Sequence, residues 1–460
     1  MTALERSAGA DGSTAPALDG LAAAGLRTVI VAAPDMQGRL LGRRMSVEQL
    51  RGRLDGIDLC TCALAWDIDQ SLELRVDYAG FHSGWPDMRL VPDLATLRPL
   101  AWLDGVALCF GDLREEGGEP VPIGPRAMLE RQVERLARLG YDAQIGSELE
   151  FYLYRGTAAE ARAAGYRGLT PTTEHHADYL ISPGNLMEPF FARLRDGLES
   201  SGVALELEQG EWGLGQWEVN MRYAAALEAA DRHALFKLAT KEVATQEGLC
   251  ATFMARPSND AIGSSGHVHL SLTDRDGRPA FHDADAERGL SEVYRWAVGG
   301  VLEHVAAFMA WYAPTINSYR RAAREELVAG AGVTWGHDNR TTTVRTVGAT
   351  PQSVRMELRL PGADANPYLV FAALLASVAD GIERRLDPGP PLLGNAYEQE
   401  RAPLPADLAA AAAALRGSAL ARRAFGELAV DHYAAVAEHE WRQFMAVVGE
   451  WEIARYFEQI

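Results

Sequence analysis

The stretch "SELEFYLY", residues 147–154, places two glutamates at alternate positions among apolar and aromatic residues. Side chains of a β-strand alternate between its two faces, so the sequence predicts that Glu148 and Glu150 share one face and that Leu149 and Phe151 share the other. Two carboxylates about 7 Å apart along a strand repel each other unless a positive charge lies near both. The stretch therefore predicts a strand with a charged site on one face and the protein core on the other.

Three further segments repeat this pattern: "LELEQGEWGLGQWEVNM" (205–221), "GHVHLSL" (266–272) and "VRMELRLPG" (354–362). One such segment alone is most simply an amphipathic strand with a solvated face. Four of them, with carboxylates, imidazoles and guanidinium groups, indicate strands whose polar faces surround one cavity. The polar residues on these faces are Glu206, Glu208, Glu211, Glu218, His267, His269, Ser271, Arg355, Glu357 and Arg359.

The residue types on these strands point to a class of chemistry. Several carboxylates coexist in one cavity only when cations are present. Oxygen ligands together with an imidazole suit Mg²⁺ or Mn²⁺, and arginines beside them match an anionic substrate. This combination favours metal-dependent phosphoryl transfer, with metal-dependent hydrolysis as the alternative from the chemistry alone.

Composition sets limits on partners and location. The chain has 460 residues and a formal charge of −19, which disfavours attraction to nucleic acid or to an anionic membrane. Its four cysteines have no spacing typical of a zinc site, and we expect them to be reduced. The sequence shows no signal peptide and no apolar run of spanning length, so we expect a cytoplasmic protein with no membrane partner.

A Gly/Pro-rich segment, "GGEPVPIGP" (117–125), is the best candidate for a domain boundary. Before it, residues 26–45 predict a hairpin that turns at Gly38, and after it residues 126–139 predict a helix that stops at Gly140. We expect a flexible tail at 1–20, one domain at 21–116 and a second at 117–460. Strands and helices in irregular order indicate an α+β fold.

Six ordered motifs resemble the glutamine synthetase superfamily in its type I-like branch: "SELEF", "EWGLGQWE", "GSSGHVHLS", "INSYRR", "DNRTTTVR" and "RMELRLPGADANPYL". The resemblance extends from about Asp35 to the C-terminus. It implies a small N-terminal β-grasp domain and a large catalytic domain with a curved antiparallel sheet, a half-barrel flanked by helices. It also implies a homo-oligomer, a dodecamer of two hexameric rings with sites between neighbouring subunits.

The resemblance further implies an ATP-dependent ligase that phosphorylates the γ-carboxylate of glutamate and lets an amine displace the phosphate. Two ions, Mg²⁺ or Mn²⁺, would be held, one by Glu150, Glu211 and Glu218, the other by Glu148, His267 and Glu357. Glutamate would be bound by Gly263, Arg321 and Arg359, and the phosphates by Arg340 and Arg345. The nucleotide site would be lined by Glu206, Tyr223, His269, Ser271 and Arg355.

The sequence departs from this family on the side of the attacking amine. His82 stands near the aspartate that binds ammonium in ammonia-dependent members, with Asp87 in a shifted alignment as the alternative. The segment "AAREELVAGAG" (322–332) replaces the family's catalytic flap, with Leu327 or Val328 at the position of its glutamate. We take nearby Glu326 as the candidate base.

Two smaller departures lie beside the acid substrate. Ile262 replaces an asparagine and Arg256 replaces a lysine, which leaves open whether glutamate itself is the acid substrate. Tyr397 lies in a loop similar to one that some type I members adenylylate, and we expect it to be unmodified.

These departures are similar to the γ-glutamyl-amide branch, which joins glutamate to polyamines, ethanolamine or other organic amines. "YRGLTPTTEHHADYL" (166–180) is similar to a segment of that branch, and an exposed polar loop is the alternative. The amine pocket would use Tyr179 and the polar residues Thr172, Glu174, His175, His176 and Asp178, with Trp85 as an apolar wall. An ammonia-dependent glutamine synthetase and a non-catalytic scaffold are the alternative functions.

Overall fold

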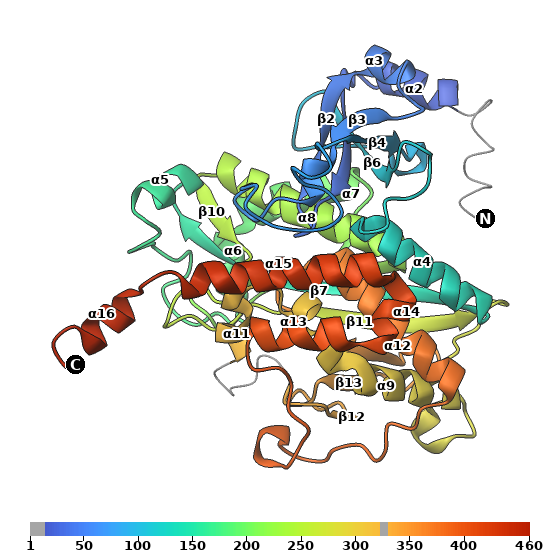
Figure 1. The fold of residues 1–460 in the computed structure, drawn as a ribbon, viewed down its shortest axis with the longest axis vertical. Coiled ribbons are helices and arrows are strands. Elements are labelled where there is room, and N and C mark those ends of the chain that lie inside the picture. The colour runs from blue at the N-terminus through green and yellow to red at the C-terminus, as the bar shows by residue number, and fades with distance from the viewer. Residues whose placement is uncertain (1–13, 323–329) are drawn as a thin grey trace.

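The computed structural model describes residues 14–322 and 330–460, and these residues form two β-sheets (Figure 1). The N-terminal sheet has the strand order β2–β1–β6–β4–β3, with β5 paired to β6. Its strands are β1 (Thr28–Pro34), β2 (Leu40–Ser46), β3 (Ile57–Cys60), β4 (Asp87–Pro92), β5 (Arg98–Pro99) and β6 (Val106–Arg114), and two helices accompany them, α2 (Thr14–Ala23) and α3 (Val47–Arg51).

The predicted hairpin is confirmed, because β1 and β2 pair antiparallel on either side of Gly38. Gly38 has φ 79°, a left-handed conformation that glycine adopts without the steric cost of a Cβ. β1 also pairs parallel with β6, so the first and last strands of this sheet are neighbours.

The larger sheet has the order β12–β13–β14–β11–β7–β9–β8, with β10 paired to β7. Its pairings are antiparallel except that of β12 with β13, which is parallel. The strands are β7 (Tyr141–Arg155), β8 (Leu205–Gly210), β9 (Gln216–Ala225), β10 (Leu249–Thr252), β11 (Gly266–Asp274), β12 (Trp335–His337), β13 (Val344–Val347) and β14 (Arg355–Leu358).

Helices cover this larger sheet, and α15 runs across the view in Figure 1 while α16 extends away from the body. The helices are α4 (Pro125–Arg138), α5 (Ala158–Ala163), α6 (Ile181–Leu186), α7 (Glu188–Ser200), α8 (Ala226–Gln246), α9 (Glu292–His304), α10 (Met309–Tyr312), α11 (Ile316–Ala322), α12 (Pro367–Arg384), α13 (Leu408–Gly417), α14 (Ala419–Phe425), α15 (Glu427–Met445) and α16 (Glu450–Tyr456). No described helix combines the length and the apolar character that a membrane span requires. The expected α+β fold, with a curved sheet flanked by helices, is confirmed.

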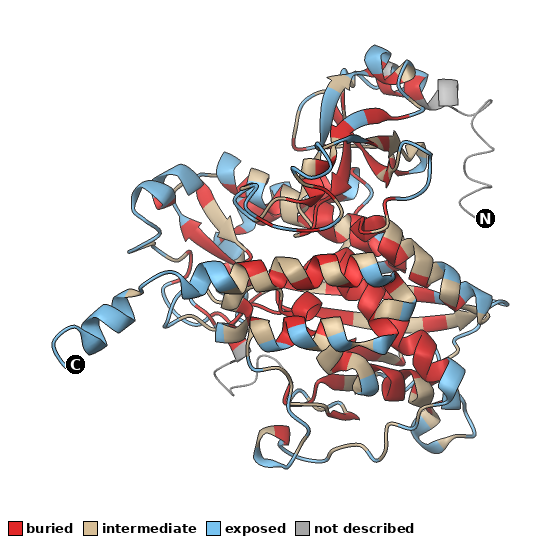
Figure 2. Cartoon of the chain, in the orientation of Figure 1, coloured by how far each residue is buried: buried red, intermediate tan, exposed pale blue. Residues whose placement is uncertain are grey.

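The apolar face of β7 belongs to the core, as its alternating sequence predicts. Leu149 and Phe151 are fully buried. The ring centroid of Phe151 lies 6.0 Å from that of Phe236 of α8 and 5.4 Å from that of Phe253. Burying side chains of this size stabilises the fold by about 2 kcal/mol each. Figure 2 shows the same division over the whole chain, with buried residues concentrated in the central strands and helices and exposed residues along α16.

The Gly/Pro segment 117–125 connects the two sheets. α4 begins at Pro125, the last residue of this segment, and ends at Arg138. Gly140 follows with φ 95°, so the predicted helix and its stop are confirmed. A division into domains at 21–116 and 117–460 stays a prediction.

Candidate active site

Three rows of directly opposed residues cross the polar face of the larger sheet. In an antiparallel pair, opposed side chains on one face have Cβ atoms about 5 Å apart, so a row joins residues that are distant in sequence. The rows are Arg345–Glu357–His269 across β13, β14 and β11; His267–Glu148–Asn220 across β11, β7 and β9; and Glu150–Glu218–Gln209 across β7, β9 and β8. The four sequence segments are therefore parts of one site.

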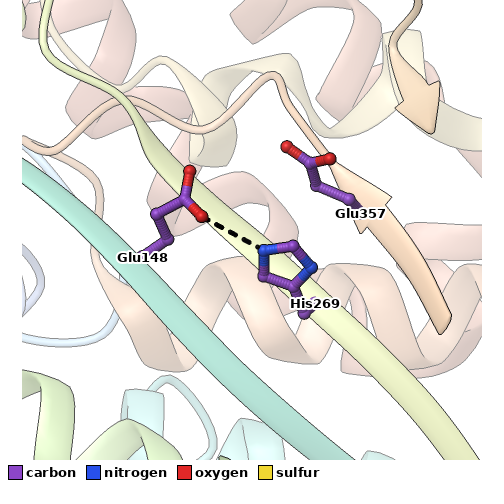
Figure 3. Close-up of side chains that lie close together, drawn as sticks. All are labelled: Glu148, His269 and Glu357. Carbon is purple, nitrogen blue, oxygen red and sulfur yellow. Dashed lines mark hydrogen bonds and ion pairs between the residues drawn. The ribbon is translucent and has the colours of Figure 1, made fainter. Parts of the chain in front are cut away.

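Glu148 lies at the centre of a group with two histidines. Its Oε1 is 2.7 Å from Nδ1 of His267, and its Oε2 is 3.3 Å from Nε2 of His269 and accepts from Nδ2 of Asn220 at 3.2 Å. Burial opposes ionisation of this carboxyl, but the hydrogen bonds to His267 and His269 outweigh it and hold the pKa of Glu148 well below its usual range. Figure 3 shows Glu148, His269 and Glu357 turned toward one another. One possible ligand atom from each of them lies within 4.8 Å of the other two.

The two histidines differ in their second partners. Nε of Arg355 donates to Nδ1 of His269 at 3.3 Å, which leaves the His269 proton on Nε2, facing Glu148. Nδ1 of His267 lies between Glu148 and Glu357, at 3.5 Å from the latter, and within the described residues its buried Nε2 has no hydrogen-bond partner. Burial and the nearby charge of Arg359 lower the pKa of His267, and a neutral imidazole is the form that binds a metal ion.

Glu357 joins this group to the arginines. Its Oε2 accepts from Arg345 at 2.9 Å, and its Oε1 forms an ion pair with Arg359. Burial disfavours its charge, but His267 and Arg359 more than compensate and lower the pKa of Glu357. Nε of Arg345 also donates to Asp338 at 3.0 Å, so this guanidinium is held from two sides.

The third row, together with Glu211, forms a group of three carboxylates. Nε2 of Gln209 donates to Glu211 at 3.2 Å and to Glu218 at 3.3 Å. Glu150 is 8% exposed, and its Oε2 accepts from Nε2 of Gln216 at 2.8 Å and from the backbone N–H of Ser265 at 2.9 Å.

The electrostatics of the three carboxylates favour binding of a cation among them. Burial, followed by repulsion from Glu211, raises the pKa of Glu150 to about 8. Burial and repulsion from Glu148, Glu150 and Glu211 raise the pKa of Glu218 to about 11. A divalent cation among these oxygens would relieve the repulsion, and hard cations such as Mg²⁺ and Mn²⁺ prefer such oxygen ligands. The residues present therefore fit both metal ions that the resemblance implies.

The residues expected to bind glutamate lie beside Glu150. Arg321 is 3% exposed, and its guanidinium donates to the carbonyl of Leu360 at 2.8 Å and to Oγ of Ser265 at 3.0 Å. Gly263 packs against the stem of Arg321, since a Cβ on this glycine would lie 2.5 Å from the Arg321 Cγ. Nε of Arg359 donates to the carbonyl of Arg340 at 3.1 Å.

The residues expected to bind the nucleotide lie mostly around His269 of β11. A Cβ on Gly146 would lie 3.7 Å from the Cβ atoms of both His269 and Tyr223, which places these two side chains together. Ser271 is two residues beyond His269 on β11. Glu206 is exposed and lies at the irregular register of β8, between Leu205 and Leu207.

The remaining expected residues lie at the edge of the site or outside it. Arg340 is exposed, and its charge lowers the pKa of the Tyr179 phenol, against the larger raising effects of burial and Asp178. His82 is exposed in the loop before β4, and Nε2 of its ring is 3.2 Å from the carbonyl of Asp77. Within residues 14–322 and 330–460 it makes no hydrogen bond to the residues above. Glu326, like Glu325, Leu327 and Val328, lies outside the described residues.

Three amides of the site were not expected from the sequence: Gln209, Gln216 and Asn220. Gln216 and Asn220 flank Glu218 at alternate positions of β9, so the same alternation that identified the glutamates could have found them. Each donates a hydrogen bond to a site carboxylate and fixes its direction.

Comparison with known proteins shows the family to which the chain belongs. Residues 122–456 match the family model described as glutamine synthetase, catalytic domain. The chain belongs to this glutamine synthetase family. The predicted resemblance is thereby confirmed, and with it the fold that it implied.

Within the family, the chain is similar to enzymes named for organic amines. It is 42% identical over 446 residues to a γ-glutamylethanolamide synthetase of Streptomyces coelicolor, covering 96% of this chain and 95% of that one. It is 37% identical over 438 residues to a glutamate–isopropylamine ligase of a Pseudomonas species, covering 94% and 95%. A glutamine synthetase of Thermus thermophilus is 36% identical over 388 residues, covering 80% of this chain and 84% of that one.

A solved structure has the same fold along nearly its whole length. The complex of GmaS with ADP superimposes with a TM-score of 0.84 at 28% identity, covering 96% of this chain and 99% of that one.

Proposed function

We propose that the protein is an ATP-dependent glutamate–amine ligase, which joins the γ-carboxyl group of glutamate to an organic amine and releases ADP and phosphate. The main support for the proposal is that two groups of metal-ligating side chains lie on neighbouring rows of the sheet. In one of these groups, Glu357 binds both Arg345 and Arg359. Similarity over nearly the whole length to two organic-amine ligases supports the choice of acceptor.

Two divalent ions, Mg²⁺ or Mn²⁺, complete the site in this proposal. Glu150, Glu211 and Glu218 would hold one, and Glu148, His267 and Glu357 the other, with His269 as a further ligand candidate of the second group. When bound, such ions neutralise phosphate charge and stabilise the charge that spreads over a transferring phosphoryl group.

The arginines and Gly263 act on the substrates. Arg321 and Arg359, with the close approach that Gly263 allows, position the α-carboxylate of glutamate. Arg345, held by Glu357 and Asp338, and Arg340 at the exposed edge bind phosphate oxygens. Preorganised donors of this kind stabilise developing charge by several kcal/mol, about 3 kcal/mol for one donor.

Two bond exchanges make up the proposed reaction. A γ-carboxylate oxygen of glutamate bonds to the terminal phosphorus of ATP while the bond to ADP breaks. The amine nitrogen then bonds to the acyl carbon, phosphate leaves with its bonding electron pair, and the nitrogen loses a proton to a carboxylate base, for which Glu326 is our candidate.

The nucleotide in this proposal lies along β11 and its neighbours. His269, Ser271, Arg355 and Tyr223 would contact it, and Glu206 would reach it from β8. A complex of ADP with the similar protein GmaS supports nucleotide binding to this fold.

Assembly and location belong to the same proposal. We propose a cytoplasmic dodecamer of two hexameric rings with His82 reaching the site of a neighbouring subunit. Exposed apolar side chains on α16, such as Trp451 and Ile453, support association between copies. Light scattering of the purified protein would measure the mass, and a monomer would contradict this part.

The proposed acceptor is tested by comparing amines in one assay. Phosphate release from ATP and glutamate is measured with ammonia, ethanolamine, isopropylamine and putrescine, and the product is identified by mass. We expect an organic amine to have the highest kcat/KM. Ammonia as the best acceptor would instead favour an ammonia-dependent glutamine synthetase; the Thermus relative is named a glutamine synthetase. No ATP turnover with any acceptor would favour a non-catalytic scaffold.

A further inference from the structure

The segment after Pro171 is fastened to the turn that carries Glu211. The Oγ1 of Thr173 accepts from the backbone N–H of Gly215 at 2.7 Å. Ala177 is fully buried against Gly210, where a Cβ would lie 2.7 Å from the Ala177 oxygen. A side chain at residue 210 would therefore push the two segments apart. Residues 173–179 and 210–215 pack against each other and form one wall, which includes Glu211.

Trp212 lies on this wall next to Glu211. Nδ1 of His176 hydrogen-bonds with the Trp212 carbonyl, and the two rings meet edge to face with centroids 6.3 Å apart. The backbone N–H of Trp212 points to Oε2 of Glu211 at 3.4 Å. The indole is nevertheless 52% exposed, so its ring presents an apolar surface beside a carboxylate.

Asp178 follows the buried Ala177 and precedes Tyr179, which is 67% exposed with φ 58°. Bulky residues rarely adopt this left-handed conformation, so the backbone here is held by its neighbours. Asp178 directly follows Ala177 and Glu211 directly follows Gly210, so the contact of Ala177 with Gly210 places these two residues on neighbouring segments. In agreement with this, the negative charge of Asp178 raises the pKa of Glu211 and of Tyr179, in each case less than burial does.

We infer that Asp178 and Trp212 determine specificity for the acceptor: Asp178 attracts the ammonium group of a primary alkylamine and Trp212 covers the carbon attached to it. This inference rests on the proposed function. An aromatic face beside a carboxylate is suited to an organic cation, because the ring attracts the charge and shields the alkyl group. Ammonia has no carbon to pack on the indole, so the wall selects for organic amines.

The experiment uses the full-length enzyme and the better acceptor of isopropylamine and ethanolamine. The variants are Asp178→Asn, Asp178→Glu, Trp212→Ala and Trp212→Phe, with Asp196→Asn as a matched control on the exposed face of α7. Ammonia tests the role of the carbon, and hydroxylamine, which is mostly uncharged at neutral pH, tests the role of charge. A thermal melt of each variant reports folding.

For Asp178→Asn we expect the KM of the organic amine to rise about tenfold or more, with the KM values of ATP, glutamate and hydroxylamine changed less than about twofold. Asp178→Glu, which keeps the charge, should restore most of the affinity. For Trp212→Ala we expect a rise of about tenfold for the organic amine and little change for ammonia, and Trp212→Phe should recover most of it. Asp196→Asn should behave as the wild type.

Three results overturn the inference alone. The first two are equal effects of Asp178→Asn on charged and uncharged acceptors, and equal effects of Trp212→Ala on ammonia and the organic amine. Unchanged KM values in both variants overturn it as well. A wild-type enzyme that forms product only from ammonia overturns the proposed function itself, and the inference with it.

Discussion

His267 lies directly opposite Glu148 in the pairing of β11 with β7, and its Nδ1 is 2.7 Å from Oε1 of that glutamate. The two residues are 119 positions apart in sequence, so only the strand register brings them together. A slip of one residue would turn one of them into the core, because side chains alternate between faces. The residues of the site therefore come together only in this register of the sheet.

Replacing either glutamate of the opening motif should stop ATP turnover without unfolding the protein. We expect Glu148→Ala and Glu150→Gln each to lower kcat by about 100-fold or more, because each group of ligands loses one oxygen donor. Circular dichroism and light scattering in the absence of metal should show the fold and the mass of the wild type. Full activity in either variant would show that the replaced glutamate is not a metal ligand.

The raised pKa values of Glu150 and Glu218 predict how the stability of the metal-free protein depends on pH. The pKa of Glu150 is about 8 and that of Glu218 about 11 in the folded protein, while an unfolded glutamate has a pKa of about 4.3. Between about pH 5 and 8 the folded state therefore holds protons that the unfolded state releases, so a rising pH favours unfolding.

Melting temperatures measured with chelator from about pH 5 to about pH 8 should thus fall with pH, and the fall should be smaller in a Glu150→Gln, Glu218→Gln double variant. Adding Mn²⁺ should also reduce it, because the cation stabilises the ionised carboxylates. An equal fall of melting temperature with pH in the wild type and the double variant would show that the pKa values of Glu150 and Glu218 are not raised.

Arg345 should tolerate no conservative replacement. Lysine cannot donate to Glu357 and Asp338 in the planar geometry of a guanidinium while also binding a phosphate. We expect Arg345→Lys to lower kcat by about 100-fold and to leave the KM of the amine unchanged. Arg138→Lys, at an exposed position of α4, is the control. A KM effect confined to the amine would place Arg345 elsewhere in the reaction.

Gly263→Ala should weaken glutamate binding. The new Cβ would lie 2.5 Å from the Cγ of Arg321, whose buried guanidinium has no room to retreat from its carbonyl partners. We expect the KM of glutamate to rise about tenfold, with a smaller change for ATP. Gly117→Ala, which adds its Cβ in open space, controls for the substitution itself. A selective rise for ATP would contradict the assignment of this loop to glutamate.

The sequence predicts the strands of the site well because alternation is a local property. The polar and apolar faces around Glu148 and Glu357 follow from it, and so do the hairpin at Gly38 and the helix that ends before Gly140. The amides Gln216 and Asn220 obey the same rule, but an amide carries no charge that would single it out. Gln209 does not follow the alternation of Glu206 and Glu208, because Gln209 pairs with Glu218 while Glu208 pairs with Val219 and binds Arg195.

Other features depend on packing that no local pattern contains. Nothing in the sequence around Arg321 shows that its guanidinium is buried against the carbonyl of Leu360. The contact of Ala177 with Gly210, which places Asp178 beside Glu211, is equally remote from any motif. The acceptor side of the site is accordingly where prediction from sequence was weakest.

The central claim is that the γ-carboxylate of glutamate is phosphorylated and that an organic amine then displaces the phosphate. The most direct test supplies glutamate with ¹⁸O in the γ-carboxylate, together with ATP and ethanolamine or isopropylamine, and follows the phosphate by ³¹P NMR and the product by mass. We expect one ¹⁸O atom in each phosphate released and one molecule of γ-glutamyl amide for each phosphate. Phosphate without ¹⁸O, or labelled phosphate formed only with ammonia, would contradict it.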